Sequence, residues 1–312
     1  MTNEMKDKIC LVTGATSGIG FVTALELAQK GATVVVCGRE QEKAANVVIK
    51  IRSQSNNPNV DFLLADLSDF KEVRNLAEEF IKAYPKLDVL VNNAGAIFKE
   101  FDLNPQRVEK TMALNHFSIF LLTGLLLDTL KASAPSRIIN VSSMLHKNGS
   151  NNFNDLNNET NYKGLAAYNN SKLALLHFTY ELARRLNGGT VTVNAMHPGW
   201  VKSNFGNEYK TGVYGIVDTL FKPIQLTSEQ GAQTIIYLAS SPDIENISGK
   251  YFVKKNAINS SDSSYNEAVS KQLWQLSEEL TNFKWPDNIG FNTISEIKKT
   301  PSIPKQDDGK NS

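Results

Sequence analysis

Cysteine, histidine and long apolar runs are scarce in this chain of 312 residues. Its two cysteines, Cys10 and Cys37, fall in apolar stretches that predict buried strands, so we expect free thiols packed as small apolar groups and no disulfide framework. The four histidines are not grouped with Asp, Glu or Cys at the spacing of metal ligands, which predicts that no catalytic metal is bound. The longest apolar run, residues 117–127, is too short to span a bilayer, and residues 1–7 contain no apolar signal region. These absences predict a cytoplasmic protein without a transmembrane segment.

The chain also lacks an excess of positive or negative charge. The formal net charge is +1 and the basic residues form no cluster, so the chain has no electrostatic footprint for nucleic acid or an anionic membrane. A hydrophobic content of 41% with moderate charge is typical of a soluble globular protein. We therefore expect a small molecule as the partner, and no nucleic acid.

Apolar, β-branched runs alternate with helical stretches along the chain. This alternation is typical of βαβ units and predicts a doubly wound parallel α/β sheet of the Rossmann type, in a single domain over residues 1–284. After Asn282 the sequence turns polar and contains prolines, which predicts a flexible tail over residues 285–312. Sheets of this kind bind ligands at the carboxyl ends of their strands, near the switch in strand order. The predicted strands cover residues 9–12, 33–37, 60–64, 89–92, 137–141 and 190–195.

The first predicted strand runs into a glycine-rich turn, Thr13 to Gly20, and then into an amphipathic stretch that ends at Lys30. Glycines permit tight bending and close approach of the backbone to a pyrophosphate, which the N-terminus of the next helix holds through free N–H groups and its dipole. The spacing is Gly14-x-x-x-Gly18-x-Gly20, which departs from the Gly-x-Gly-x-x-Gly fingerprint of many dinucleotide-binding proteins. A dinucleotide site is the prediction.

Tyr168 and Lys172 are four residues apart, and Tyr168 lies 25 residues after Ser143. On a helix the two side chains share a face, so the ammonium would favour the ionised phenol by on the order of 3 kcal/mol, or about two pKa units. Such a phenol, beside a hydroxyl donor, predicts proton transfer at a carbonyl or alcohol. Spacing alone decides nothing, because Tyr251 and Lys255 have it too, in a segment that is predicted to be a strand.

Taken in order, these motifs resemble the short-chain dehydrogenase/reductase family over residues 6–284. The resemblance is carried by Thr13 to Gly20, Asp66-Leu67, Asn92-Asn93-Ala94-Gly95, Asn115, Ser143, Tyr168 with Lys172, and Pro198-Gly199.

The closer resemblance is to the retinol dehydrogenase-like branch. It is carried by Asn115-His116-Phe117, Phe120 to Thr123, Ala134 to Ser143, the long insertion between Ser143 and Tyr168, Glu181 to Leu186, Gln230 to Thr234, and Gln272-Leu273-Trp274.

The resemblance implies four catalytic residues. Tyr168 would exchange the substrate proton, and Ser143 would bind the substrate oxygen, although Ser142 beside it competes for that role. Lys172 would lower the pKa of Tyr168 and hold the nicotinamide ribose. Asn115 would hold a water in a proton relay; the alternative is a polar residue that opens an apolar helix.

The resemblance also implies a cofactor site built from many short segments. Asp66 would accept from the adenine amino group or simply shape a turn before the next helix. Ser203 stands where the family usually has a threonine. The predicted cofactor-binding residues are Gly14, Thr16, Ser17, Gly18, Ile19, Gly20, Arg39, Asp66, Leu67, Asn93, Ala94, Gly95, Tyr168, Lys172, Pro198, Gly199, Val201 and Ser203.

The choice between cofactors depends on the end of the second strand, where a basic side chain accommodates a 2′-phosphate and an acidic one holds a ribose hydroxyl. Here Arg39 favours NADP(H), while Glu40 beside it leaves NAD(H) as the alternative.

The substrate depends on two segments with few motifs, residues 144–165 and 204–226. The second is rich in apolar side chains, as in a lid over an apolar pocket or in ordinary packing. We expect the substrate to be an alcohol, aldehyde or ketone of retinoid-like or lipid-like character, and the alternative substrate is a steroid or xenobiotic carbonyl. The alternative function is that of a non-catalytic nucleotide sensor. His146 could reach the substrate, but a surface position is the simpler expectation. The helix over residues 117–127 and the helix that carries Tyr168 resemble the pair that forms homodimers in relatives.

Overall fold

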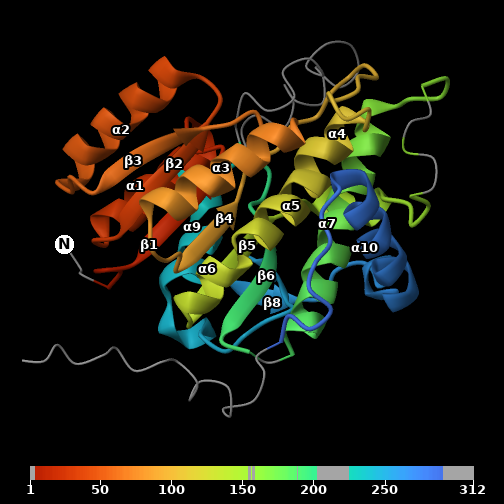
Figure 1. Ribbon diagram of the computed structural model, residues 1–312. Coiled ribbons are helices and arrows are strands. Elements are labelled where there is room, and N and C mark those ends of the chain that lie inside the picture. Colours follow the sequence, from red (N-terminus) through yellow and green to blue (C-terminus); the bar gives the residue numbers. More distant parts are fainter. Residues whose placement is uncertain (1–3, 154–155, 157–158, 188, 202–224, 291–312) are drawn as a thin grey trace, which may run out of the picture.

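The computed structural model describes residues 4–153, 156, 159–187, 189–201 and 225–290. They form one sheet with the strand order β3-β2-β1-β4-β5-β6-β7-β8, in which only β8 runs antiparallel to its neighbour. The predicted doubly wound α/β fold is confirmed (Figure 1). The strands are β1 Ile9–Thr13, β2 Thr33–Gly38, β3 Val60–Leu64, β4 Val89–Asn92, β5 Ser136–Val141, β6 Val191–His197, β7 Tyr251–Val253 and β8 Asn256–Ile258.

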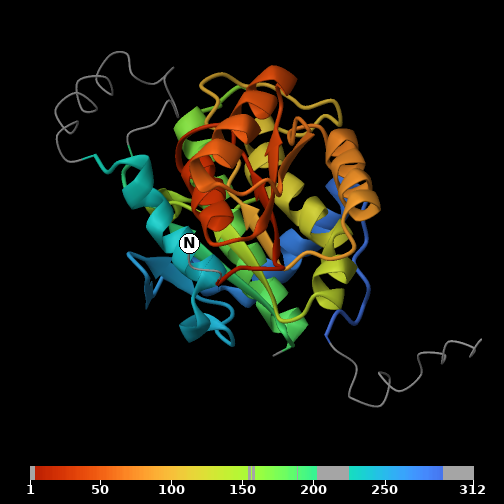
Figure 2. The same ribbon diagram turned by 90° about the vertical axis from the view of Figure 1, so that its left-hand side faces the viewer.

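Helices cover both faces of the sheet, as the views in Figures 1 and 2 show. Alternate residues of β1 point to opposite faces, so Cys10 and Val12 pack under α1, α2 and α9, while Leu11 packs in the cluster that includes α3, α5 and α7. The helices are α1 Gly18–Gln29, α2 Gln41–Ser55, α3 Phe70–Ala83, α4 Lys110–Met112, α5 Ser118–Leu125, α6 Leu127–Ala132, α7 Gly164–Leu186, α9 Ser228–Ser240 and α10 Glu267–Thr281. The short turns are the π-helix η1 Ala113–Phe117 and the 3-10 helices η2 Met144–Asn148, η5 Pro242–Ile244 and η6 Asp262–Tyr265.

The strand order places the switch point between β1 and β4. The chain moves outward from β1 through β2 to β3, and then crosses back to start the other half of the sheet at β4. The turns that follow β1 and β4 therefore diverge from adjacent strands, which opens the crevice in which sheets of this kind bind ligands.

An aromatic layer from the end of the described chain covers α5 and α7. Trp285 is 2% exposed and lies 4.8 Å from the Trp274 ring of α10 and 5.5 Å from the Phe120 ring of α5, between centroids. Phe178 of α7 joins the same cluster. Packing thus continues past the boundary predicted at residue 284, because Trp285 and Ile289 are core residues; the predicted tail was started too early, and residues 291–312 lie outside the described residues.

The same layer bears on the predicted homodimer. Phe120 and Phe178 belong to the two helices that were predicted to form the dimer contact. Both side chains are buried under α10 and the segment that follows it. The homodimer stays a prediction, and it needs a surface other than these side chains.

Candidate active site

The glycine turn between β1 and α1 is shaped for close backbone contact. Gly14 has a φ of +63°, and a Cβ there would lie 2.8 Å from the Cα of Ala94. A Cβ on Gly20 would lie 2.6 Å from the side-chain nitrogen of Asn93 and would collide with the carbonyl of Gly14. The turn therefore tolerates no side chain at either position, and it is held against the segment that follows β4.

Hydrogen bonds between Thr13 and Asn93 tie the two diverging turns together. The Asn93 side-chain amide donates to the carbonyls of Thr13, at 2.8 Å, and Gly14, at 3.2 Å. The Thr13 hydroxyl accepts from the backbone N–H groups of Asn93 and Ala94, both at 3.0 Å. Asn93 thus shapes the crevice with its amide, and its contact with the cofactor stays a prediction.

The N-terminus of α1 points out of this turn without a side-chain cap. Ser17 is the N-cap residue, has extended backbone and is exposed, and its hydroxyl makes no capping hydrogen bond. The first N–H groups of a helix lack partners within the helix, and its dipole attracts anions. Thr16 contacts the position where Gly38 would carry a Cβ, and Ile19 and Val201 lie together against Gly231 of α9. The predicted residues of the turn are therefore brought together around a potential phosphate site.

The end of β2 presents one basic side chain. Arg39 is exposed, and none of the ion pairs among the described residues involves it. Glu40 pairs with Lys43 at 2.9 Å, and this hydrogen bond lowers the pKa of Glu40. The acidic alternative is thus engaged by a lysine of its own helix.

Asp66 and Leu67, after β3, both make contacts that shape the fold. One carboxylate oxygen of Asp66 accepts from the backbone N–H and the hydroxyl of Ser68, at 2.9 and 2.8 Å. Leu67 is 6% exposed and packs in the core, so only its backbone can face a ligand. Asp69 caps α3 by accepting from Lys71 N–H.

Ser143 and Tyr168 are brought together by β5 and α7, as predicted. The Ser143 side chain hydrogen-bonds the Tyr168 hydroxyl, and it also accepts from Leu145 N–H at 3.2 Å, because Ser143 is the N-cap of η2. Ser142 points elsewhere, since its hydroxyl donates to the carbonyl of Lys172 at 3.1 Å. Among the two adjacent serines, Ser143 is the one beside the phenol.

Lys172 lies one helical turn after Tyr168, on the same face of α7. Its Nζ is 5.6 Å from the centroid of the Tyr168 ring and donates to the carbonyl of Val141 at 2.9 Å. Tyr168 is 7% exposed and Lys172 3% exposed, so the pair is almost completely removed from water.

Burial, rather than mutual attraction, dominates the pKa values of this pair. Desolvation raises the pKa of Tyr168 to about 12, against a smaller lowering by the hydrogen bond from Ser143. Desolvation lowers the pKa of Lys172 to about 8. The net pKa of Tyr168 therefore lies above its usual value, whereas the spacing predicted a value below it, because the sequence spacing contained no information about burial.

Asn115 lies in the π-helix η1 and links three parts of the site. Its amide oxygen accepts from Ala96 N–H at 2.9 Å, and its amide nitrogen donates to the Ala96 carbonyl and to the Ser171 hydroxyl, at 2.8 and 3.0 Å. Both amide hydrogens are therefore used within the protein. A Cβ on Gly95 would lie 3.1 Å from the Asn115 amide oxygen and 3.3 Å from Lys172 Nζ. The absence of a side chain at Gly95 therefore lets Asn115 and Lys172 lie close to this segment of the backbone. The relay through a water stays a prediction.

The turn after β6 completes the carboxyl edge. Gly199 has a φ of +87°, which favours glycine, and Pro198 precedes it, half-buried. Val201 bridges to Leu226. Ser203 and most of the segment 204–226 lie outside the described residues.

His146 lies in the interior of the protein, so the surface position predicted for it is wrong. It is 0% exposed rather than on the surface, and both ring nitrogens have hydrogen-bond partners. One of its partners, Ser261, lies 115 residues away along the chain, so local sequence offered no signal of this burial.

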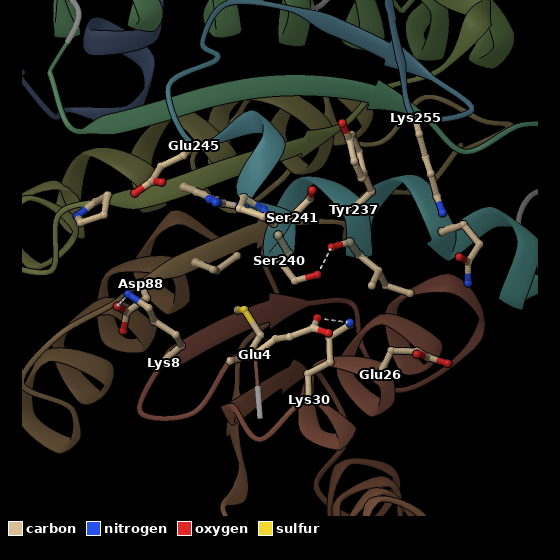
Figure 3. A pocket seen from close by; sticks show the side chains of 18 residues that line it. Glu4, Lys8, Glu26, Lys30, Asp88, Tyr237, Ser240, Ser241, Glu245 and Lys255 are labelled. Carbon is tan, nitrogen blue, oxygen red and sulfur yellow. Dashed lines mark hydrogen bonds and ion pairs between the residues drawn. The ribbon is translucent and has the colours of Figure 1, made fainter. Parts of the chain in front are cut away.

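A separate cavity of about 760 Å³ opens at the opposite edge of the sheet, where β1, β4 and β5 begin (Figure 3). Four of its charged side chains form two ion pairs, Lys30 with Glu4 at 2.6 Å and Lys8 with Asp88 at 2.9 Å. Its other charged side chains, Glu26, Arg137, Glu245 and Lys255, belong to no ion pair among the described residues. It contains none of the predicted site residues, which all follow the carboxyl ends of strands or lie on adjacent helices.

The described residues contain no group of three or more His, Cys, Asp or Glu side chains that could hold a metal ion. Within the same part of the chain, no helix is long and apolar enough to cross a membrane.

Comparison with known proteins gives this geometry a context. The family model described as short chain dehydrogenase matches residues 8–213. Mouse (Mus musculus) retinol dehydrogenase 12 is 39% identical over 283 residues, which cover 90% of this chain and 89% of that protein. Human (Homo sapiens) retinol dehydrogenase 14 is 40% identical over 291 residues, which cover 88% of this chain and 86% of that protein.

Solved structures agree. The crystal structure of an uncharacterized protein from Mycobacterium Paratuberculosis matches with a TM-score of 0.73 and 30% identity, covering 90% of this chain and 96% of that chain. A short chain dehydrogenase from Shigella flexneri, complexed with NADP, matches with a TM-score of 0.64 and 25% identity, covering 82% of this chain and 100% of that chain.

Proposed function

The chain belongs to the short-chain dehydrogenase family and is an NAD(P)-dependent oxidoreductase; on that premise we propose that it uses NADP(H) to interconvert an apolar alcohol with its aldehyde or ketone. The observation that carries the proposal is the assembly of Ser143, Tyr168 and Lys172 beside the turn that bears Gly14. Retinoid-like and other lipid-derived carbonyls are the proposed substrates, because the relatives above include retinol dehydrogenases.

The residues at the crevice fit a dinucleotide. Gly14 and Gly20 let the turn pack against Ala94 and Asn93. A Cβ on Gly18 would meet nothing nearer than the Ser228 hydroxyl at 4.0 Å, so the backbone at Gly18 is open to a close-lying phosphate. The uncapped N-terminus of α1 would hold the pyrophosphate through its N–H groups. These features suit the group that the family binds.

When bound, the nicotinamide supplies or accepts the hydride. In reduction, Tyr168 gives its proton to the carbonyl oxygen, and a pKa of about 12 keeps it protonated at neutral pH. Ser143, already hydrogen-bonded to the Tyr168 hydroxyl, donates to the same oxygen as negative charge develops. The Lys172 ammonium, 5.6 Å from the phenol ring, stabilises the phenolate that remains. Asn115 holds Ala96 and Ser171 in register around this group.

NADP(H) is preferred in this proposal because Arg39 is exposed at the end of β2 while Glu40 is occupied by Lys43. A guanidinium matches a 2′-phosphate with charge-assisted hydrogen bonds. A carboxylate that is held by a neighbouring lysine competes poorly for a ribose hydroxyl.

An apolar substrate is proposed because large apolar side chains stay exposed next to the reacting groups. Met144 and Leu145 directly follow Ser143 and are 54% and 37% exposed. Trp200, after Gly199, is 49% exposed. Exposed apolar groups gathered beside polar ones are typical of ligand sites.

The test is consumption of NADPH and NADH, measured separately with retinal, medium-chain aldehydes, steroid ketones and quinones. We expect turnover with NADPH and the apolar aldehydes. A preference for steroids or quinones would keep the mechanism and change the substrate class. Cofactor binding without turnover of any compound would favour a nucleotide sensor instead.

A further inference from the structure

The peptide unit between Ser143 and Met144 is held from two sides by buried histidines. His146 lies in η2, and its Nδ1 is 2.6 Å from the Ser143 carbonyl oxygen. His197, the last residue of β6, accepts from Met144 N–H through its Nδ1 at 3.3 Å. The Ser143 carbonyl also accepts from the backbone N–H of His146 at 3.2 Å. Both polar groups of this peptide plane are therefore held by side chains, one from η2 and one from the end of β6.

The tautomer of His146 follows from its second contact. Its Nε2 lies 3.0 Å from the backbone N–H of Ser261 and must accept, because a backbone amide nitrogen can only donate. A neutral imidazole has one donor and one acceptor, so Nδ1 carries the proton and donates to the Ser143 carbonyl. Burial lowers the pKa of His146, which favours this neutral form.

Ser261, the partner of His146 Nε2, lies in a segment that hydrogen-bonds and packs against α7. Ser261 follows Ser260, whose hydroxyl hydrogen-bonds the Tyr180 hydroxyl of α7 at 2.7 Å. The Tyr180 ring stacks on Tyr265 with centroids 5.1 Å apart. His146 therefore connects the turn after β5 to a segment that is anchored on the helix of Tyr168 and Lys172.

That peptide is linked to the Ser143 hydroxyl through the N-cap hydrogen bond from Leu145 N–H. Rotation of the plane changes ψ of Ser143, now 154°, and with it the N-cap geometry in which the Ser143 hydroxyl accepts from Leu145 N–H. A rotation that breaks this contact would release χ1 of Ser143, and with it the hydrogen bond between Ser143 and Tyr168. A hydroxyl that must meet developing charge is sensitive to such displacement, since misplacement of about 1 Å costs on the order of 100-fold in rate.

We propose that His146 is a positioning residue for the reaction: by donating to the Ser143 carbonyl from a fixed tautomer, it holds the Ser143 hydroxyl against Tyr168, with His197 fixing the other side of the same peptide. This inference rests on the proposed function, because it acts through Ser143. Because His146 is 0% exposed, it acts through Ser143 in this proposal and not by contact with the substrate.

Two substitutions at this position separate its two hydrogen bonds. In His146→Asn the side-chain amide occupies the place of Nδ1 and can still donate to the Ser143 carbonyl. In His146→Gln the amide reaches the place of Nε2, so the contact with Ser261 is kept and the donor to Ser143 is lost. We expect His146→Gln to lower kcat for NADPH-dependent reduction roughly tenfold, with an unchanged KM for NADPH, and His146→Asn to restore kcat to within about threefold of wild type.

His177→Gln is the matched control. His177 is also 0% exposed and uses both ring nitrogens, toward Ser270 and Asn151, but it has no contact with Ser143. Its substitution should lower the thermal midpoint about as much as His146→Gln does and leave kcat unchanged. If His146→Gln yields no soluble protein, His197→Leu and His197→Asn test the same peptide from the other side, with Asn keeping the acceptor for Met144 N–H.

Ser143→Ala separates this inference from the proposed function. If Ser143→Ala leaves turnover unchanged, the proposed function itself is wrong. If Ser143→Ala lowers turnover and His146→Gln then causes no further loss in that background, His146 acts through Ser143 as proposed. Equal losses in both backgrounds, or a wild-type kcat for His146→Gln, would overturn the positioning role while leaving the catalytic role of Ser143 intact.

Discussion

The carboxyl and amino edges of the sheet use their polar groups in different ways. At the amino edge, the cavity of Figure 3 contains two ion pairs, Lys30 with Glu4 and Lys8 with Asp88, beside four charged side chains outside any ion pair of the described residues, but it contains neither the glycine turn nor Ser143, Tyr168 or Lys172. At the carboxyl edge, α1 begins without a side-chain cap and Arg39 belongs to no ion pair of the described residues. Paired charges stabilise the fold, whereas donors left at strand ends are available to a ligand. A hollow alone therefore does not identify the site.

The sharpest test of this contrast is Tyr168→Phe at the carboxyl edge. Loss of the proton donor should reduce kcat by about 10²–10⁴-fold while NADPH still binds, because general acid catalysis contributes rate enhancement of that size. Steady-state kinetics and fluorescence titration with NADPH measure the two quantities. Tyr251→Phe is the matched control, since the Tyr251 hydroxyl is buried without a hydrogen-bond partner in the described structure. Equal activity in the two variants would refute the assignment of Tyr168.

Lys172→Met should have the next largest effect, on the order of 100-fold in kcat, and it should also change the pH profile. Reduction by the wild type should slow as pH rises through about 8, where Lys172 loses its proton while Tyr168, with a pKa of about 12, keeps its own. The variant should lack this limb. Activity of the wild type measured from pH 6 to 10 gives the profile, and a limb that persists in Lys172→Met would belong to another group.

The stability of the same variant has a defined sign. The pKa of Lys172 is lowered from 10.5 to about 8, so between these values the unfolded chain binds more protons than the folded protein. The free energy of unfolding of the wild type should therefore rise relative to Lys172→Met as pH increases from about 8 to 10.5. Urea titrations at several pH values measure this difference.

Arg39→Ser should have a smaller effect, confined to one cofactor. Loss of the guanidinium should raise the KM for NADPH by roughly tenfold and leave the KM for NADH unchanged, because only NADPH has the 2′-phosphate. Kinetics with both cofactors measure the split. An equal change for both would mean that Arg39 does not read the phosphate.

Lys30→Ala, at the amino edge, should have the smallest effect. Its ion pair with Glu4 is partly exposed, so its loss should cost less than about 1 kcal/mol and leave both KM values and kcat unchanged. Chemical denaturation and steady-state kinetics check both statements. A large loss of activity would break the contrast between the edges.

Sequence identified the carboxyl edge because its signals are local. The glycines of the turn after β1, and Tyr168 one helical turn before Lys172, can be recognised within a few residues, and the alternation of strands and helices predicted the sheet. The family resemblance also selected Ser143 over Ser142, and the structure places Ser143 beside Tyr168.

What sequence missed depends on contacts between distant segments. The burial of His146 requires Ser261, and the burial of Trp285 requires Phe120 and Trp274. The pKa of Tyr168 moved opposite to expectation because desolvation is a property of the packed site. None of these can be read from spacing along the chain.

The central claim is that the carboxyl edge transfers hydride with Tyr168 as the proton donor. The most direct measurement uses NADPH deuterated at the transferable C4 position, with retinal or a medium-chain aldehyde, and follows label in the product alcohol by mass spectrometry. We expect one deuterium on the former carbonyl carbon with the wild type, and a rate of labelling lower by at least about 100-fold with Tyr168→Phe. Bound NADPH that transfers no label to any compound of the panel, or labelling at the same rate in the variant, would contradict the account.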